Sequence, residues 1–507
     1  MEEKGKFMAD ESRPNVLIFL CDQLRLDLLA CYGETLVRTP NISALAQDSC
    51  VFERAYTPCA ICSLARASLL TGLYPHSHHM FNNSTPRYSY CENLRPGVAM
   101  IQDWIDEESD YESAWFGKWH VGPAQDLFDS RFHHTQKPYE GGPEFLTSSH
   151  WHPSTRIAPL VESVGRSTAG TLDVGLEGFP DVVAARYSQE FLHNRDGTRP
   201  FFMTCSFPGP HSPWMVPDEW GIRYDAADIE LWPNRFDNFE GKPINQRKLR
   251  LMQEVRGKEL LRSAARPLPE GDSRQTQETK DRELRELLAC CFSYLELIDQ
   301  MVGEVLATLK ELDLYEETAV VFTADHGDMA GSHGMMSKGA YMYDEIYRIP
   351  LLVKGPGMPQ PRRSGAFVHL MDVTATCLHL MAGDKQESMM GQDLHGESLL
   401  PLVQENDSRG RAMHYAEYHG DWYGHYSARM VTDGRWKLVW NLTDLCELYD
   451  LENDPHELRN CFYDPDYEDV RATCFDNLMA EAQRTDDAQL RLLLPQVEIA
   501  AQGTAGL

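Results

Sequence analysis

The sequence contains no apolar run long enough to span a bilayer, and its first fourteen residues, MEEKGKFMADESRP, lack the apolar core of a secretory signal. We therefore expect residues 1–13 to form a flexible leader and the protein to be cytoplasmic, with no membrane partner. Positive charge is also scarce, since 47 Lys and Arg oppose 77 Asp and Glu, a formal net charge of −30. This balance argues against a nucleic-acid partner, and an anionic substrate would need cations gathered at its site.

The cysteines lack the pairing pattern of a disulfide scaffold or a structural zinc site. Their number, thirteen, is odd, and they are scattered from Cys21 to Cys474. Cys59 and Cys62 have CxxC spacing, but no second pair accompanies them, so we expect mostly reduced thiols. Low-complexity tracts and internal repeats are absent as well, and a content of 42% hydrophobic and 24% charged residues is typical of a globular protein.

Buried-type strands alternate with amphipathic helices along the chain. Residues 15–20, NVLIFL, and residues 318–324, TAVVFTA, read as core strands of a parallel sheet, and apolar residues recur at helical spacing over residues 284–309. Ligands of such sheets bind at the carboxyl ends of the strands, where Asp22 and Asp325 follow. A further helix is predicted to begin at Thr39, with the hydroxyl as its cap, before the strand VFERAY.

We predict an α/β fold with a large, mixed and mostly parallel central sheet flanked by helices, and a smaller C-terminal α+β domain that contains an antiparallel sheet. The catalytic domain is expected over residues 14–385, with a charged surface insertion at 225–283. The smaller domain is expected over residues 386–507, where Asp433-Gly434 is a hairpin turn signal.

The segment CSLARASLLTG places Cys62 at the predicted start of a helix, with Arg66 one turn further on. A helix N-terminus stabilises anions and lowers the pKa of a thiol, and Arg66 could bind the same anion. For an isolated pair, the alternative of a buried structural cysteine beside a surface arginine would be preferred.

This segment resembles the sulfatase signature CxPxRxxxLTG, in which the cysteine is oxidised to formylglycine. Leu64 stands at the proline position of the signature, but the surrounding ARASLLTG is intact. Four other blocks, in the expected order, resemble formylglycine-dependent type I sulfatases of the alkaline phosphatase-like superfamily: PNVLIFLCDQLRLDLLACYG, FGKWHVG, FTADHGDMAGSHGMMSKGAYMYDEIYRIPLLV and ELYDLENDPHELRN. The resemblance implies a metal-dependent sulfuric ester hydrolase with an alkaline phosphatase-like fold.

Two adjacent pairs at strand ends, Asp22 with Gln23 and Asp325 with His326, are the predicted metal ligands. Carboxylate and amide oxygens suit Ca²⁺, whereas the imidazole also suits Mn²⁺ or Zn²⁺, and Mg²⁺ stays open. Turn capping would be the simpler explanation for either pair alone. The resemblance implies calcium, with Cys62, once converted, as a further ligand.

The resemblance also implies the catalytic roles. A hydrated formylglycine at position 62 attacks sulfur, and His120 serves as its base. Arg66, Lys118 and Lys338 neutralise the sulfate oxygens, and His211, shared with Lys338, protonates the leaving oxygen. Asn83 is expected to touch the sulfate.

Other histidines and tryptophans receive no catalytic role. We expect the histidines to lie at the surface or behind the site, and the tryptophans to belong to the core rather than to stack on a sugar or aryl group. These residues are His76, His78, His79, His333, Trp214, Trp220 and Trp232.

The predicted function is hydrolysis of a sulfate monoester of a saccharide, aryl or alkyl alcohol. The implied partners are that small-molecule substrate and a maturation enzyme, either formylglycine-generating or radical. Assembly into an oligomer is left open. Gln23 suggests a second function, that of a phosphonate monoester or phosphodiester hydrolase. A catalytically silent anion-binding protein is the third, if Leu64 prevents maturation. Specificity is assigned to residues 123–185 and 225–283, which carry no readable motif.

Overall fold

The structure is a computed structural model that describes residues 13–33, 35–84, 93–108, 110–122, 132–135, 157–161, 169–172, 175–251, 277–356, 358, 362–382, 394–404, 410–420 and 426–492. The predicted leader and much of the predicted specificity loops lie outside the described residues. In the described part of the chain, no helix combines the length and the apolarity that a membrane span requires. The twelve described cysteines are free thiols, as the sequence predicts, and Cys91 lies outside the described residues.

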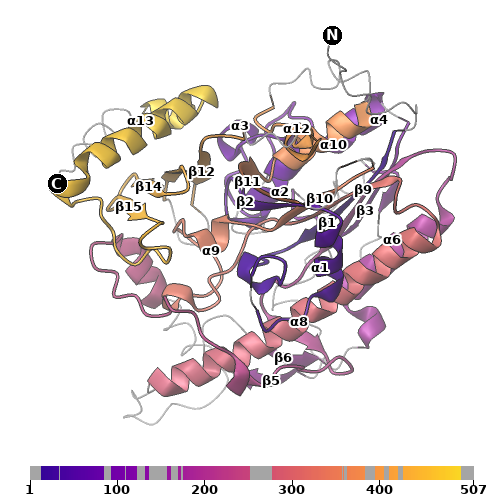
Figure 1. Cartoon of the computed structure of the whole chain (residues 1–507), viewed down its shortest axis with the longest axis horizontal. Coiled ribbons are helices and arrows are strands. Elements are labelled where there is room, and N and C mark those ends of the chain that lie inside the picture. Colours follow the sequence, from indigo (N-terminus) through magenta and orange to yellow (C-terminus); the bar gives the residue numbers. More distant parts are fainter. Residues whose placement is uncertain are drawn as a thin grey trace.

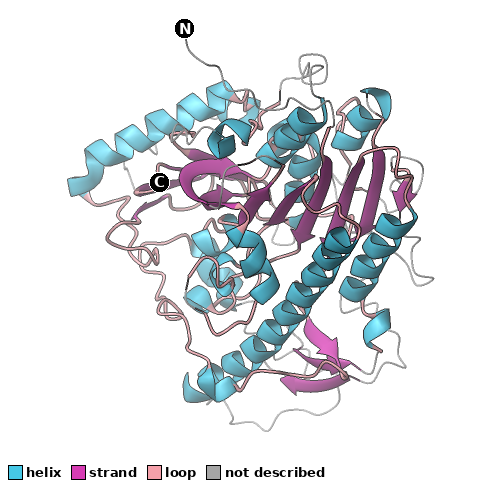
Figure 2. Ribbon diagram, turned by 45° about the vertical axis from the view of Figure 1, so that its right-hand side comes forward, coloured by secondary structure: helices cyan, strands magenta, loops and turns pink. Residues whose placement is uncertain are grey.

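A large sheet forms the centre of the molecule (Figure 2). Its eight strands follow the order β11-β2-β10-β9-β1-β7-β3-β4. All neighbouring pairs are parallel except those of β10, which runs antiparallel to both β2 and β9. This confirms the mostly parallel sheet of an α/β fold. Its strands are β1 Asn15–Cys21, β2 Cys50–Tyr56, β3 Glu112–Gly117, β4 His134–Thr135, β7 Phe201–Phe207, β9 Thr318–Ala324, β10 Leu351–Lys354 and β11 Arg362–His369.

Both faces of this sheet are covered by helices, which explains why β1 is apolar at every position after Asn15. Val16, Ile18 and Leu20 belong to one buried cluster, and Leu17 and Phe19 belong to another. The first cluster includes side chains from α2 Cys62–Thr71, α4 Ile101–Glu108 and α10 Asp372–Ala382. The second includes side chains from α1 Pro40–Gln47, α6 Pro180–Asn194 and α8 Gln277–Glu311. Figure 1 shows α6 and α8 together on one side of the sheet and α2 with α10 on the other.

The predicted strands at residues 15–20 and 318–324 are confirmed as β1 and β9, and the predicted long helix is the core of α8. The helix after Thr39 is also confirmed as α1, but its predicted cap is wrong. The Thr39 side chain makes no capping hydrogen bond. Instead, Asp299 of α8 accepts hydrogen bonds from the backbone N–H groups of Asn41 and Ile42, at 3.1 and 2.8 Å. The partner comes from another helix, which a local sequence pattern does not reveal.

A second, smaller sheet confirms the predicted antiparallel C-terminal element. Its strands are β12 His414–Tyr418, β13 Ala428–Thr432, β14 Trp436–Asn441 and β15 Glu447–Asp450, paired in that order. The Asp433-Gly434 turn joins β13 to β14, with Gly434 at a φ of 92°. Helix α13 Glu468–Arg484 lies beside this sheet (Figure 1).

The remaining elements are short. A three-stranded sheet holds β5 Ile157–Val161, β6 Ala169–Leu172 and β8 Trp214–Pro217. The other helices are α3 Pro75–His78, α9 Asp344–Tyr347, α12 Leu400–Gln404 and α14 Ala488–Leu492, with 3₁₀ turns at Leu26–Leu28, Leu176–Gly178, Ala226–Asp228, Ser332–Gly334 and Pro465–Tyr467.

The described part of the predicted insertion is not purely a surface feature. Lys242 is buried, and its ammonium donates to Asp237 and to the backbone oxygen of Glu457, both at 2.5 Å. Gln246, also buried, donates to Glu447 at 2.8 Å. These contacts join the segment to the C-terminal sheet, and residues 277–283 belong to α8. The domain boundaries themselves stay predictions.

Candidate active site

The site begins at the carboxyl ends of β1 and β9, which are parallel neighbours. Cys21 pairs with Ala324 in the register, so the next residues, Asp22 and Asp325, lie side by side. Gln23 turns back with a φ of 62°, and its backbone N–H donates to Asp325 Oδ1 at 3.0 Å. Parallel pairing therefore brings together two acidic side chains about 300 residues apart in the sequence.

Cys62 is the first residue of α2, as the sequence predicts, and its side chain faces these strand ends. Its Sγ lies 3.8 Å from Asp22 Oδ1 and 3.1 Å from His326 Nε2. The residue before it, Ile61, gives the helix no side-chain cap, and the N–H of Ser63 is satisfied by Asn83 Oδ1 at 3.0 Å. The positive end of the helix therefore points at the site, with Asn83 attached to it.

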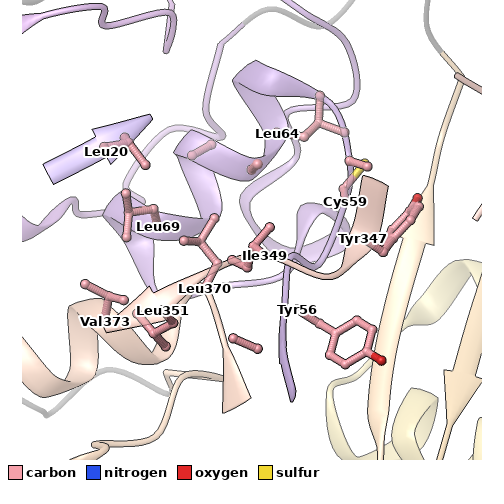
Figure 3. Packing of buried hydrophobic residues seen from close by; sticks show 14 of the residues in the cluster. Leu20, Tyr56, Cys59, Leu64, Leu69, Tyr347, Ile349, Leu351, Leu370 and Val373 are labelled. Atoms are coloured by element: carbon pink, nitrogen blue, oxygen red, sulfur yellow. The ribbon is translucent and has the colours of Figure 1, made fainter. Parts of the chain in front are cut away.

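Leu64 does not disturb this geometry. It is the third residue of α2, is buried, and belongs to the same apolar cluster as Leu69, Leu370 and Val373, some of whose members are drawn in Figure 3. The helix is complete without a proline at this position.

Four buried residues offer donor atoms that lie within 4.8 Å of one another: Asp22, Cys62, Asp325 and His326. Two carboxylates, an imidazole and the group at position 62 form a donor set that suits a divalent cation with hard oxygen ligands. Gln23 directs its Oε1 toward Lys338, which donates to it. The donor chemistry therefore fits Ca²⁺ or Mn²⁺.

Arg66 holds both carboxylates in place. Its guanidinium donates to Asp325 Oδ2 at 2.8 Å and to Asp22 Oδ2 at 3.2 Å, and Nη1 donates to Ser206 Oγ and the Lys118 backbone oxygen, each at 2.9 Å. Arg66 is fully buried. Nearly all of its N–H groups are engaged by the protein, so its first effect is to fix the carboxylates.

Lys118 and Lys338 are the cations that remain nearer the opening. Lys118 Nζ donates to Asp22 Oδ2, with an 18% exposed side chain. Lys338 Nζ contacts His211 Nε2 at 2.8 Å. Together with Arg66, they concentrate positive charge inside a protein of net charge −30, as an anionic substrate requires.

The two predicted acid–base histidines both border position 62. His211 directs Nδ1 at the Ser212 backbone oxygen, so this nitrogen carries the proton and Nε2 faces Lys338 as an acceptor. Burial and the Lys338 charge lower the pKa of His211, and burial and Lys118 lower the pKa of His120. Both imidazoles are therefore held neutral and able to take a proton.

Burial and charge act in opposite directions on the acidic groups. Burial and the neighbouring Asp22 raise the pKa of Asp325 to about 6. Burial also acts to raise the pKa of Asp22, but Lys118, His211 and Arg66 outweigh it and hold this pKa far below its usual range. For the Cys62 thiol, burial is outweighed by Lys118 and Lys338, and the pKa lies well below 9.0. The site therefore stabilises negative charge at position 62.

Three residues that the sequence analysis did not single out complete the arrangement. Ser206, on β7, accepts Arg66 through its hydroxyl and the Lys118 N–H through its carbonyl, at 2.9 Å each. Gly117 has a φ of 96°, and a Cβ there would lie 2.0 Å from the Ser206 oxygen. Asp328 accepts a hydrogen bond from Gln23 Nε2. The spacing of Asp328 from Asp325 was visible in the sequence, whereas Ser206 had no local signal.

Four other histidines are expected either at the surface or behind the site. For three of them the surface alternative is wrong. His76, His78 and His333 are buried, and only His79 is exposed. His333 bonds Asp237 at 2.6 Å. The core interpretation fits Trp214 and Trp220, which are buried in the cluster around α8, while Trp232 is partly buried under the Arg25 guanidinium at 3.8 Å.

Comparison with known proteins gives a consistent result. Residues 14–383 match the family model named Sulfatase, and residues 331–484 match the model for the C-terminal part of N-sulphoglucosamine sulphohydrolase. A relative from Escherichia coli (strain K12), an uncharacterized sulfatase, is 28% identical over 92% of this chain and 86% of its own.

Solved structures share the fold at lower identity. A structure of a protein in complex with its substrate D-glucosamine-2-N,6-O-disulfate has a TM-score of 0.71 and 19% identity, over 94% of this chain and 99% of that one. A phosphonate monoester hydrolase of Agrobacterium radiobacter has a TM-score of 0.70 and 23% identity, over 93% and 96%.

Proposed function

Because this chain belongs to the sulfatase family and is a sulfuric ester hydrolase, we propose that it cleaves its ester with a formylglycine made from Cys62 and one divalent cation. The observation that carries the proposal is the convergence at position 62. Donor atoms of Asp22, Asp325 and His326 lie within 4.8 Å of one another and of Cys62. Arg66 binds both carboxylates, and Lys118 binds that of Asp22.

Asp22, Gln23, Asp325 and His326, together with the group at position 62, would hold the cation, most simply Ca²⁺. A bound divalent cation polarises the sulfate oxygens and lowers the pKa of a neighbouring hydroxyl. Arg66 keeps the two carboxylates pointed at this position. Lys118 and Lys338 offset negative charge on the sulfate oxygens, because their positive charges stabilise an anion at position 62 and lower the pKa of the Cys62 thiol.

Proton transfer is assigned to His120 and to the Lys338 and His211 pair. His120, whose pKa the neighbouring Cys62 side chain influences, accepts the proton of the attacking hydroxyl. Lys338 supplies a proton to the leaving alcohol oxygen and regains one from solvent, while the neutral His211, whose Nε2 accepts from the ammonium, holds Lys338 in position. We assign Asn83, whose Oδ1 accepts the Ser63 N–H at 3.0 Å, to contact with the sulfate.

We propose a sulfated saccharide as the substrate class, ahead of aryl or alkyl sulfates. A structural neighbour is bound to a sugar disulfate, and its fold covers 94% of this chain. The test is hydrolysis of sulfated saccharides, aryl sulfates and alkyl sulfates by matured protein, with released sulfate as the readout. We expect the largest kcat/KM on a saccharide, and a larger value on an alkyl sulfate would contradict this class.

Phosphonate monoester hydrolysis is the second candidate function, because Gln23 occupies a ligand position and a phosphonate monoester hydrolase shares the fold. The discriminating measurement is turnover of an aryl sulfate against an aryl phosphonate monoester of the same alcohol. We expect the sulfate to be preferred. A clear preference for the phosphonate would reverse the order of the two functions.

Maturation of Cys62 by a formylglycine-generating or radical enzyme is also a proposal, and mass spectrometry of the peptide around Cys62 from the native host tests it. The expected mass is that of the aldehyde or its hydrate. Unmodified thiol alone would favour the catalytically silent anion-binding protein. Solution scattering measures the oligomeric state, and limited proteolysis tests the domain boundary near residue 386.

The variants Cys62→Ala and Asp325→Ala give the direct test of the site. Each should reduce turnover by at least a thousandfold, because one lacks the nucleophile and the other a cation ligand. Circular dichroism and thermal unfolding should show a folded protein. Substantial residual activity in either variant would show that the site is assigned wrongly.

A further inference from the structure

Gln23 presents two chemically different ends to its surroundings. Its amide Nε2 donates to Asp328 Oδ2, and its Oε1 accepts from Lys338 Nζ. A carboxylate only accepts hydrogen bonds and an ammonium only donates them, so one orientation of the amide satisfies both neighbours. Gln23 is 1% exposed, and no solvent is at hand to satisfy the other orientation.

Asp328 is itself fixed. Its Oδ1 accepts the backbone N–H groups of Ala330 at 2.7 Å and Ser337 at 2.9 Å, within the loop that follows β9. The side chain is 3% exposed. Its second oxygen therefore has a set position, and that position faces Gln23.

We propose that Asp328 is a positioning residue that orients the Gln23 amide, so that the oxygen and not the nitrogen faces the cation and Lys338. The proposal rests on the metal site of the proposed function. Amide oxygen is a ligand for a hard cation, whereas an amide NH₂ is not. Partners behind a ligand change metal affinity by about 10- to 100-fold when they are replaced.

The alternative is that Asp328 only holds its own loop through Oδ1. Asp328→Asn separates the two roles, because the introduced amide keeps an oxygen for the Ala330 and Ser337 N–H groups. Its nitrogen would then meet Gln23 Nε2, donor against donor. Gln23 would have to rotate and present its nitrogen to the cation and to Lys338.

A charge-matched exchange makes the test specific. In the double variant Gln23→Glu/Asp328→Asn, the introduced amide donates to the introduced carboxylate, and an oxygen again faces the cation. The total charge equals that of the wild type. Gln23→Glu alone instead places two buried carboxylates against each other.

The experiment is calorimetric titration of metal-stripped full-length protein with Ca²⁺, repeated with Mn²⁺. We expect Asp328→Asn to bind at least tenfold more weakly than the wild type. Adding Asp328→Asn to Gln23→Glu should instead strengthen Ca²⁺ binding, to within about threefold of the wild-type affinity. The effect of Asp328→Asn on affinity would then have opposite signs in the two proteins, which is not expected if Asp328 only holds its own loop. Asp27→Asn, which removes a 48% exposed carboxylate from the segment that follows β1 and carries Gln23, is the control.

Two results would overturn the assignment. The first is a Ca²⁺ affinity of Asp328→Asn within threefold of the wild type. The second is an Asp328→Asn effect of the same sign in the wild type and in Gln23→Glu. Either result shows that Asp328 does not orient Gln23. If Asp328→Asn does not fold, the comparison of Gln23→Glu with the double variant decides alone. A wild-type protein that binds neither Ca²⁺ nor Mn²⁺ contradicts the metal site, and the role of Asp328 with it.

Discussion

Arg66 is the residue on which the electrostatics of the site depend. It lies between two buried carboxylates and bonds both, with no exposed surface of its own. Buried charges destabilise a fold unless each has a partner, so the guanidinium neutralises Asp22 and Asp325 and would share this role with the divalent cation proposed above. The sequence suggested that Arg66 binds the sulfate directly, whereas the structure shows that its donors are mostly used by the protein.

We predict that Arg66→Ala lowers the free energy of unfolding by about 3–5 kcal/mol without metal, because two buried carboxylates lose a partner. Saturating Ca²⁺ should recover part of this loss, since the cation supplies the missing positive charge. Urea unfolding in EDTA and in excess Ca²⁺ measures both values. Arg186→Ala, which removes an exposed ion pair with Glu190, is the control. A loss below 1 kcal/mol in EDTA would contradict the role given to Arg66.

The helix α1 shows how elements are fixed by residues far away in the chain. Its first turn is capped by Asp299, which bonds two backbone N–H groups and the Asn41 side chain. The predicted cap, Thr39, has only a 3.5 Å contact from the Ala30 N–H. Helix α8 therefore satisfies the start of α1 and packs against it at the same time.

We predict that Asp299→Ala destabilises the protein by about 2 kcal/mol, at the upper end of cap replacements, because the unpaired N–H groups become buried. Thr39→Val, which keeps the shape of the side chain, should cost less than about 1 kcal/mol. Urea denaturation of both variants at pH 7.5 provides the comparison. Equal losses would mean that both residues cap the helix.

The sequence predicts the elements well where one physical pattern dominates. Residues 15–20 and 318–324 are mostly apolar and buried throughout because both sheet faces are covered, and the polar pairs after them mark the strand ends. Cys62 was placed at a helix start by the small residues that follow it. Contacts made by tertiary structure leave no such pattern, as Asp299 and Ser206 show. The Gln23 to Asp328 bond belongs to the same class.

At the scale of the whole molecule, buried polar contacts tie the C-terminal sheet to the rest. Lys437 of β14 donates to Asp344 of α9 at 2.6 Å, and Arg411 binds Asp372 of α10 at 2.5 and 2.8 Å. His76 bonds Glu417 of β12, and its other nitrogen faces the Thr485 backbone oxygen at 2.8 Å. Because both of these neighbours are acceptors, His76 is an imidazolium, which matches its raised pKa: burial is outweighed by Glu417.

Two other histidines at this junction are held neutral. His414 of β12 stacks on Tyr56 at 4.5 Å, and its edge contact with His369 of β11 is 4.6 Å. Both are fully buried, and neither nitrogen of His414 has a hydrogen-bond partner among the described residues. Burial lowers both pKa values far below 6.5, and Arg411 adds to it, although Asp344 acts in the opposite direction on His414.

This junction predicts that the protein loses stability in acid. A histidine whose pKa is lowered by folding contributes stability above its unfolded pKa of about 6.5, and that contribution falls as the pH decreases because only the unfolded chain takes the proton. Each such group adds a slope of about 1.4 kcal/mol per pH unit below pH 6. His414→Phe keeps a ring against Tyr56 but binds no proton, so its free energy of unfolding should fall less steeply between pH 6 and 5, by about that amount. Urea denaturation of the wild type and of His414→Phe at both pH values measures the two slopes. Parallel slopes for His414→Phe and the wild type would mean that His414 is already protonated in the folded protein. The loss of stability in acid would then not arise from His414 at this junction.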